Sequence, residues 1–139
     1  MRLWHIDLIP YLPKSQLVAQ WRELNSIFKK HDKHILINYV YNYSKNYILH
    51  YTGAVIDEMK NRNIKIRIFE NEINYFCNCS WFYEDYNFTE HNDQYLLICF
   101  MNLYEKHIRG QKDFDDATFG KLYDFVNEKF DLKGLGIEK

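Results

Sequence analysis

Four segments of the chain carry apolar residues at steps of three and four, the spacing of side chains along one face of an α-helix. Each apolar face of this kind has to be buried against another element. The pattern therefore predicts a mainly all-α fold, a compact bundle of packed helices. The recurring residues are Leu17, Trp21, Leu24 and Phe28; Ile48, Tyr51, Val55 and Met59; Leu96, Cys99, Phe100 and Leu103; and Phe119, Leu122, Tyr123 and Val126.

Residues typical of helix ends stand at the borders of these segments. Pro13 suits the first position of a helix that runs to about residue 30. Ser44 can cap a second helix, which runs to about residue 61, and Asn92 can cap a third. The third helix is expected to stop near Gly110. Asp115 or Asp116 starts the fourth.

The connecting segments are less regular. Residues 31–43 are compatible with a short strand or a helical turn, and the pattern does not decide between them. Residues 64–69 alternate between apolar and other side chains, which predicts a strand. Residues 74–90 are aromatic and acidic and are expected to form an irregular excursion. The glycine-containing tail from Asp131 is expected to be loosely held.

Length and charge restrict the classes of protein to consider. A chain of 139 residues is expected to form a single domain over residues 1–139, and we expect a monomer. Its net charge of −1 argues against a protein that coats nucleic acid by bulk charge. A local basic face is still compatible with the sequence, since Lys29, Lys30, His31, Lys33 and His34 form one dense cationic run.

The remaining composition favours a cytoplasmic protein without a cofactor. No apolar stretch reaches about 18 residues, and residues 1–12 are too short and broken for a signal peptide. Cys77, Cys79, His91 and Cys99 could suggest zinc, but their spacing does not match a zinc knuckle. We therefore interpret the cysteines as buried structural thiols and expect no metal. Glycine-rich phosphate loops and common hydrolase motifs are also absent from the sequence.

The chain start and the pair Arg22–Glu23 suggest one kind of chemistry. If the apolar segment 3–12 packs back along the first helix, the α-amine at the start of the chain can lie near the Glu23 carboxylate. An α-amine has an ordinary pKa near 8, against about 10.4 for lysine, so part of it is nucleophilic at neutral pH. Such an amine can attack a sugar carbon, displace a base and form an imine. The simpler alternative is that Arg22 and Glu23 only form the solvated edge of a helix.

The first 24 residues resemble the pyrimidine-dimer DNA glycosylase/AP lyase family, and especially its short bacterial members. Weaker similarity continues through residues 34–39 and 57–60, at His91 and over residues 102–106. The matching N-terminal residues are Met1, Arg2, Leu3, Trp4, His5, Leu8, Ile9, Pro10, Leu12, Pro13, Gln16, Leu17, Arg22 and Glu23.

The resemblance implies an all-α enzyme that acts on damaged double-stranded DNA without metal or cofactor. It would recognise a cyclobutane pyrimidine dimer, kink the DNA and flip out a base. The N-terminal amine, here that of Met1, would attack the sugar, and Glu23 would drive the chemistry. Arg2 and Arg22 would contact DNA. A wall for the extruded base could come from Trp4, Trp21 or Tyr39, although the simpler interpretation of each is a core position.

The chain also departs from the family prototype. The prototype exposes a threonine once its initiator methionine is removed, whereas here Met1 directly precedes the large Arg2. A third basic contact of the prototype falls on Ser26. The prototype is basic overall, and its aromatic C-terminal segment has no close counterpart in residues 130–139. Two alternatives therefore stand beside the glycosylase hypothesis: a non-catalytic module that binds nucleic acid or protein, and a lyase for another lesion or substrate.

Overall fold

The computed structural model describes residues 1–31, 33–67, 70–77, 79 and 86–139. Within these ranges the chain is helical and contains no strand, which confirms the predicted all-α fold. In chain order the elements are a 3-10 helix η1 (Ile6–Tyr11), α1 (Lys14–Lys29), a second 3-10 helix η2 (Asn38–Asn42), α2 (Lys45–Asn61), α3 (Glu70–Tyr75), α4 (Asp93–Ile108) and α5 (Asp116–Asn127).

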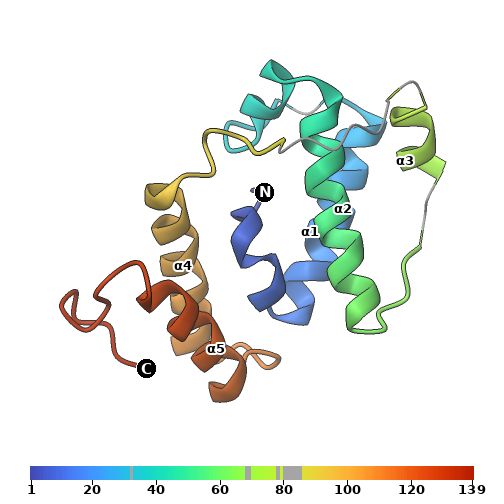
Figure 1. The fold of residues 1–139 in the computed structure, drawn as a ribbon. Helices are drawn as coiled ribbons and strands as arrows, with labels where there is room; N and C mark the ends of the chain where they lie inside the picture. Colours follow the sequence, from blue (N-terminus) through green and yellow to red (C-terminus); the bar gives the residue numbers. More distant parts are fainter. Residues whose placement is uncertain (32, 68–69, 78, 80–85) are drawn as a thin grey trace.

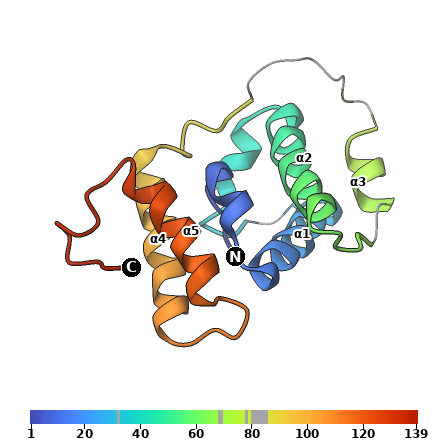
Figure 2. The ribbon, with the colours of Figure 1, turned by 60° about the horizontal axis from the view of Figure 1, so that its bottom comes forward.

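The N-terminal segment lies in the middle of the molecule. Figures 1 and 2 show α1 and α2 on one side of it, and α4 and α5 on the other. It packs against both α2 and α5. Leu3, Leu8, Ile9 and Leu12 are almost completely buried. Both helix pairs therefore share one hydrophobic core that is built around the chain start.

The helix ends follow local chemistry. The Asn92 side chain accepts a hydrogen bond from the Tyr95 amide at the start of α4, and Asp115 accepts one from the Thr118 amide at the start of α5. Ser44 precedes α2 as predicted, but its side chain makes no capping hydrogen bond. Gly110 follows α4 with φ of +83°, a conformation that glycine adopts without steric cost. All sixteen residues assigned to the four helix faces are buried.

The predicted strand is wrong for residues 64–67, and residues 68 and 69 lie outside the described ranges. The alternation itself exists, because Ile64 and Ile66 pack on the core while Lys65 and Arg67 are exposed. No second strand pairs with it within the described ranges. The Arg67 carbonyl instead accepts a hydrogen bond of 2.8 Å from the Trp21 indole. An alternating pattern needs a partner strand to become a sheet, and this segment has a helix beside it.

The C-terminal tail is packed, contrary to the expectation that it is loose. Leu132 is completely buried and Ile137 nearly so. The Tyr123 hydroxyl donates to the Ile137 carbonyl at 2.9 Å, and the Lys139 ammonium lies 2.9 Å from Asp124. The glycines allow the tail to turn back over α5 rather than leaving it free.

Residues 31–43, which were open between a strand and a helical turn, contain the helical turn η2. Of the expected excursion over residues 74–90, residues 78 and 80–85 lie outside the described ranges. Before them, α3 ends at Tyr75 and packs against α1. None of the described helices is long and apolar enough to cross a membrane.

Candidate active site

Three of the four predicted site residues line one pocket. Met1, Arg2 and Glu23 surround a hollow of about 320 Å³ in which the chain start faces the middle of α1. Its wall is completed by Trp4, by Leu36 from the turn before η2 and by Lys106 from α4. The packing of residues 3–12 against the helices brings the start of the chain to this place.

Glu23 is half-buried beside the N-terminus. Burial raises the pKa of its carboxyl above the ordinary value, and the positive charges of the N-terminus, Arg22 and His34 oppose this rise. The α-amino group is therefore close enough to Glu23 to interact with it electrostatically. This neighbourhood pairs a potential nucleophile with a carboxylate that takes up a proton more readily than an exposed one.

Gln20 is a buried polar residue beneath the pocket that sequence reasoning missed. Its amide nitrogen donates to the Glu23 carboxylate and to the Arg2 carbonyl, each at 3.1 Å. Its amide oxygen accepts from the Trp4 amide at 2.9 Å. One side chain thus ties the carboxylate to the backbone of the N-terminal segment. The available signal was an amide placed three residues after Leu17, within the apolar face of the helix.

Two tyrosines from opposite sides hold the same segment. The Tyr51 hydroxyl of α2 donates to the Trp4 carbonyl at 2.6 Å and also lies 2.9 Å from the Gln20 oxygen. The Tyr95 hydroxyl of α4 donates to the Leu3 carbonyl at 2.5 Å. Hydrogen bonds on consecutive carbonyls restrict where Met1 and Arg2 can lie.

His91 fastens the next residue of the segment. The Ile6 amide donates to its Nδ1 at 3.2 Å, and the Tyr39 hydroxyl lies 2.7 Å from its Nε2. Burial lowers the pKa of His91 to about 3, so the ring is neutral at physiological pH. Since Nδ1 accepts a hydrogen bond, the proton of the neutral ring is on Nε2 and is donated to Tyr39. His91 is therefore a fixed structural link.

Arg2 is half-buried between the N-terminal segment and α4. Its guanidinium carbon lies 5.7 Å from the centre of the Trp4 ring, within cation–π range. Burial raises the pKa of Tyr95, and a hydrogen bond from the Arg2 side chain opposes this rise. Arg2 therefore contributes to the wall of the pocket as well as to its charge.

Arg22 lies outside this pocket, on the neighbouring face of α1. It lines a separate groove of about 650 Å³ together with four other cations, and none of the described residues that line the groove is acidic. Trp21 and Met59 also line the groove, so its lining combines apolar side chains with positive charge. The other cations are Lys14, Lys29, Lys65 and Arg67.

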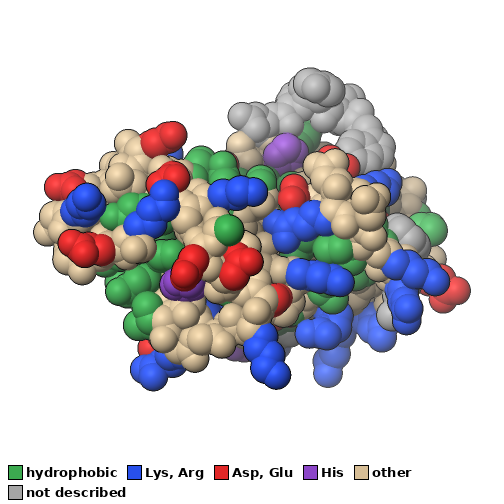
Figure 3. Space-filling model, turned by 90° about the horizontal axis from the view of Figure 1, so that it is seen from below, with side chains coloured by type: hydrophobic (Ala, Val, Ile, Leu, Met, Phe, Trp, Pro, Cys, Tyr) green, Lys and Arg blue, Asp and Glu red, His purple; other side chains and the backbone are tan. Residues whose placement is uncertain are grey.

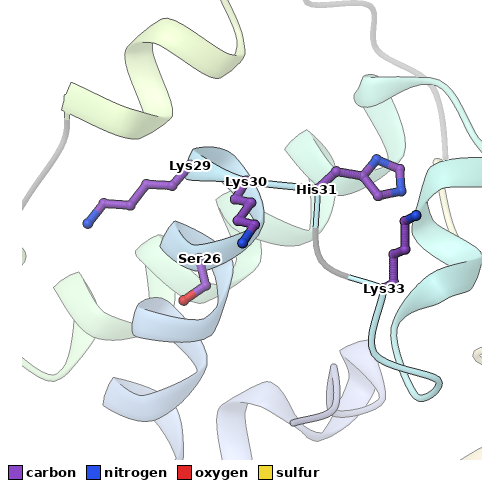
Figure 4. A pocket seen from close by; sticks show the side chains of 5 residues that line it. All are labelled: Ser26, Lys29, Lys30, His31 and Lys33. Carbon is purple, nitrogen blue, oxygen red and sulfur yellow. The ribbon is translucent and has the colours of Figure 1, made fainter.

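The cationic run after α1 continues this basic surface. Lys29, Lys30, His31 and Lys33 line a pocket of about 580 Å³ together with Ser26 (Figure 4). Ser26 and Lys29 belong to this pocket and to the groove of Arg22, so the two hollows adjoin. We call them together the basic groove. Figure 3 shows mainly basic side chains on the part of one face formed by α1, α2 and α3, whereas both signs mix on the side of α4 and α5.

The cysteines are not all buried, which corrects the interpretation as buried structural thiols. Cys99 is buried, but Cys77 is exposed and Cys79 is partly exposed. Cys77 and Cys79 follow the short helix α3, which itself contains no buried residue. In the described part of the chain, no three histidine, cysteine or acidic side chains come together as metal ligands would.

The three aromatic residues considered as a wall for an extruded base differ in their positions. Trp4 lines the pocket of Met1, and Trp21 lines the basic groove. Tyr39 is hydrogen-bonded to His91 and packs against the Phe88 ring. Trp4 and Trp21 are 7% and 5% exposed, so little of either side chain is accessible from the two hollows.

With this geometry in place, comparison with known proteins gives one result. Residues 1–69 match the family model of the pyrimidine dimer DNA glycosylases. The N-terminal half of the chain is therefore similar to this family. The part shared with the family contains Met1, Arg2, Arg22 and Glu23, as well as most of the basic groove. The helices α4 and α5 lie beyond the match. No curated protein and no solved structure matches the chain.

Proposed function

We propose that this protein is a DNA repair glycosylase with AP lyase activity, acting on pyrimidine dimers in duplex DNA. The observation that carries the proposal is the pocket in which the start of the chain lies against Glu23, within a segment that matches the family. Met1 supplies the nucleophilic amine, and Glu23 is the acid–base and electrostatic group. Arg2 and Arg22 contact the DNA around the lesion. No metal or cofactor is required.

The reaction starts when the Met1 nitrogen bonds to C1′ of the damaged nucleotide and the bond from C1′ to the base breaks. The base leaves with the electron pair and takes up a proton. A proton from the amine then reaches the sugar ring oxygen as the ring opens, which leaves an imine between C1′ and nitrogen. Removal of a proton from C2′ expels the 3′ phosphate and cleaves the strand. Glu23 stabilises the cationic sugar and carries protons between these atoms.

The basic groove supports binding of duplex DNA despite the net charge of −1. Phosphate contacts supply most of the affinity of proteins for DNA, and a few well-placed lysines and arginines can make them. Arg22 and Glu23 are consecutive on α1, so the groove and the pocket of Met1 flank the same helix. DNA held along the groove would place one strand beside the amine. Lys29, Lys30 and Lys33 provide charge around Ser26, where the family prototype has a basic residue.

The second candidate is a non-catalytic module that binds DNA through the same groove. The near-neutral net charge favours it, because the remaining surface adds little general attraction for DNA. The two candidates differ in one observable, a covalent bond between protein and DNA.

Borohydride trapping tests the proposal. Untagged protein, incubated with dimer-containing and abasic duplexes under borohydride, should form a stable adduct by reduction of the imine. Acetylation of the N-terminus, or one residue added before Met1, should abolish the adduct and leave the melting temperature unchanged. One residue added after Lys139 is the matched control and should leave trapping intact. DNA binding without any adduct would favour the non-catalytic module, and full trapping with a blocked N-terminus would contradict the role of Met1.

A further inference from the structure

The turn between α1 and η2 presents large apolar side chains to solvent at the pocket of Met1 and Glu23. Ile35 is 82% exposed, more than any other large hydrophobic residue in the described ranges, and Leu36 beside it is 41% exposed. Leu36 also lines the pocket. Isolated exposed hydrophobic residues are common on protein surfaces. This pair differs from the other exposed hydrophobic residues in that Leu36 lines the candidate active site and Ile35 directly precedes it in the chain.

The turn is held in place rather than hanging free. The amides of Ile37 and Asn38 both donate to the His34 carbonyl at 3.0 Å, and the Leu36 amide donates to the His34 ring at 3.2 Å. Ile37 is completely buried and anchors the turn in the core. The exposed tip therefore projects from a fixed base, which keeps the entropy cost of inserting it into another molecule low.

Charge surrounds the tip. Lys33, which lines the basic groove, and His34, whose positive charge would act on Glu23, directly precede the tip in the chain. Two apolar side chains that follow Lys33 and His34 are too small a patch for a protein interface, which needs about 800 Å² from each partner. They suit a ligand that combines phosphates with stacked apolar faces, and duplex DNA is such a ligand.

We propose that Ile35, supported by Leu36, is a wedge that enters the base stack of DNA beside the lesion. This inference rests on the proposed function and concerns how the substrate is opened. Proteins that kink DNA often insert Ile, Leu, Phe or Met between base steps and partly unstack them. Extruding a base from the helix costs a few kcal/mol. The wedge fills the space that the extruded base leaves, and Lys33 and His34 hold the flanking phosphates.

The first test measures base extrusion without chemistry. A duplex carries a dimer opposite 2-aminopurine, whose fluorescence rises when it leaves the stack, and all proteins carry Glu23→Gln. At protein concentrations shown by anisotropy to saturate the duplex, Ile35→Ala should reduce the fluorescence rise at least twofold. Ile108→Ala, which alters an exposed isoleucine at the end of α4, is the matched control and should not reduce it. Equal fluorescence with Ile35→Ala and the control would overturn the wedge.

The second test uses turnover and separates opening from catalysis. Ile35→Ala should lower kcat/KM on the dimer-containing duplex at least tenfold. A duplex with the dimer opposite two abasic analogues has no base pair to open there, and it should restore the variant to within twofold of the wild-type protein. Ile35→Met, which keeps apolar bulk, should retain activity on both substrates. An equal loss on both duplexes would show a role other than wedging.

The two proposals can fail separately. If borohydride trapping fails but the fluorescence rise still depends on Ile35, the protein opens DNA without cleaving it. If trapping succeeds and the rise does not depend on Ile35, the enzyme extrudes the base by other contacts and the wedge is wrong.

Discussion

At the scale of single residues, burial of the Glu23 carboxylate destabilises the fold but places a carboxylate in the candidate active site. Its carboxylate is half-buried, and burial raises its pKa. Gln20 donates one hydrogen bond to it, and the N-terminus and Arg22 supply nearby positive charge. These partners hold the carboxylate in place but do not fully replace the water lost on burial. A residue kept under such conditions is a candidate for chemistry rather than for stability.

Glu23→Gln should therefore be more stable and less active. The glutamine keeps the shape and can still accept from Gln20, but it carries no charge to desolvate. Because the pKa of Glu23 is raised in the folded state, the cost of ionising it is present above that pKa and disappears below the ordinary value of 4.5. The melting temperature of Glu23→Gln should exceed that of wild type at pH 7, and the two should converge as the pH falls towards 4. Glycosylase activity should fall by about 100-fold or more. A variant that is less stable at pH 7, or equally active, would contradict this.

At the scale of elements, the prediction from sequence was good where one helix determines its own pattern. The apolar faces of α1, α2, α4 and α5, and the capping residues Asn92 and Asp115, depend on residues three or four apart, so they can be recognised locally. The strand expected at residues 64–67 failed because strand formation depends on a distant partner. The buried amide of Gln20 was missed because three of its four hydrogen-bond partners, Arg2, Trp4 and Tyr51, come from elsewhere in the chain. For the same reason, placing Met1 near Glu23 needed the family resemblance, and Arg22 turned out to line a different hollow.

The packed tail leads to a prediction at this scale. Leu132 is completely buried after α5, while Leu135 is 59% exposed three residues later. Leu132→Ala should lower the free energy of unfolding by about 2–5 kcal/mol, as is usual when a core leucine is truncated. Leu135→Ala is the matched control and should change it by less than about 0.5 kcal/mol. Denaturant unfolding of both variants measures the difference, and similar small changes in the two would restore the expectation of a loose tail.

At the scale of the whole molecule, charge is distributed unevenly. The net charge of −1 arises from 18 basic and 19 acidic residues, yet the described residues that line the groove of Arg22 include five cations and no acidic side chain. The protein can therefore attract phosphate locally without a general positive field. If DNA binds only along this local groove, its affinity should depend weakly on salt concentration, because few phosphate contacts are made.

The salt dependence of DNA binding tests this distribution. We expect the slope of log K against log salt to correspond to roughly three to five phosphate contacts, at about 0.9 per contact. Arg22→Ala should weaken binding and reduce the slope by about one contact. Lys121→Ala, on the exposed side of α5, removes an equal charge far from the groove along the chain and should leave the slope unchanged. An identical effect of both variants would place Arg22 outside the interface.

The central position of residues 3–12 has a consequence for biosynthesis. This segment is apolar, and α5, which helps to cover it, is synthesised about a hundred residues later. On the ribosome, the segment has to wait for most of the chain before its final neighbours exist. Fragments that lack α4 and α5 also lack Tyr95, which donates to the Leu3 carbonyl. The pocket of Met1 and Glu23 is therefore complete only when folding is nearly finished.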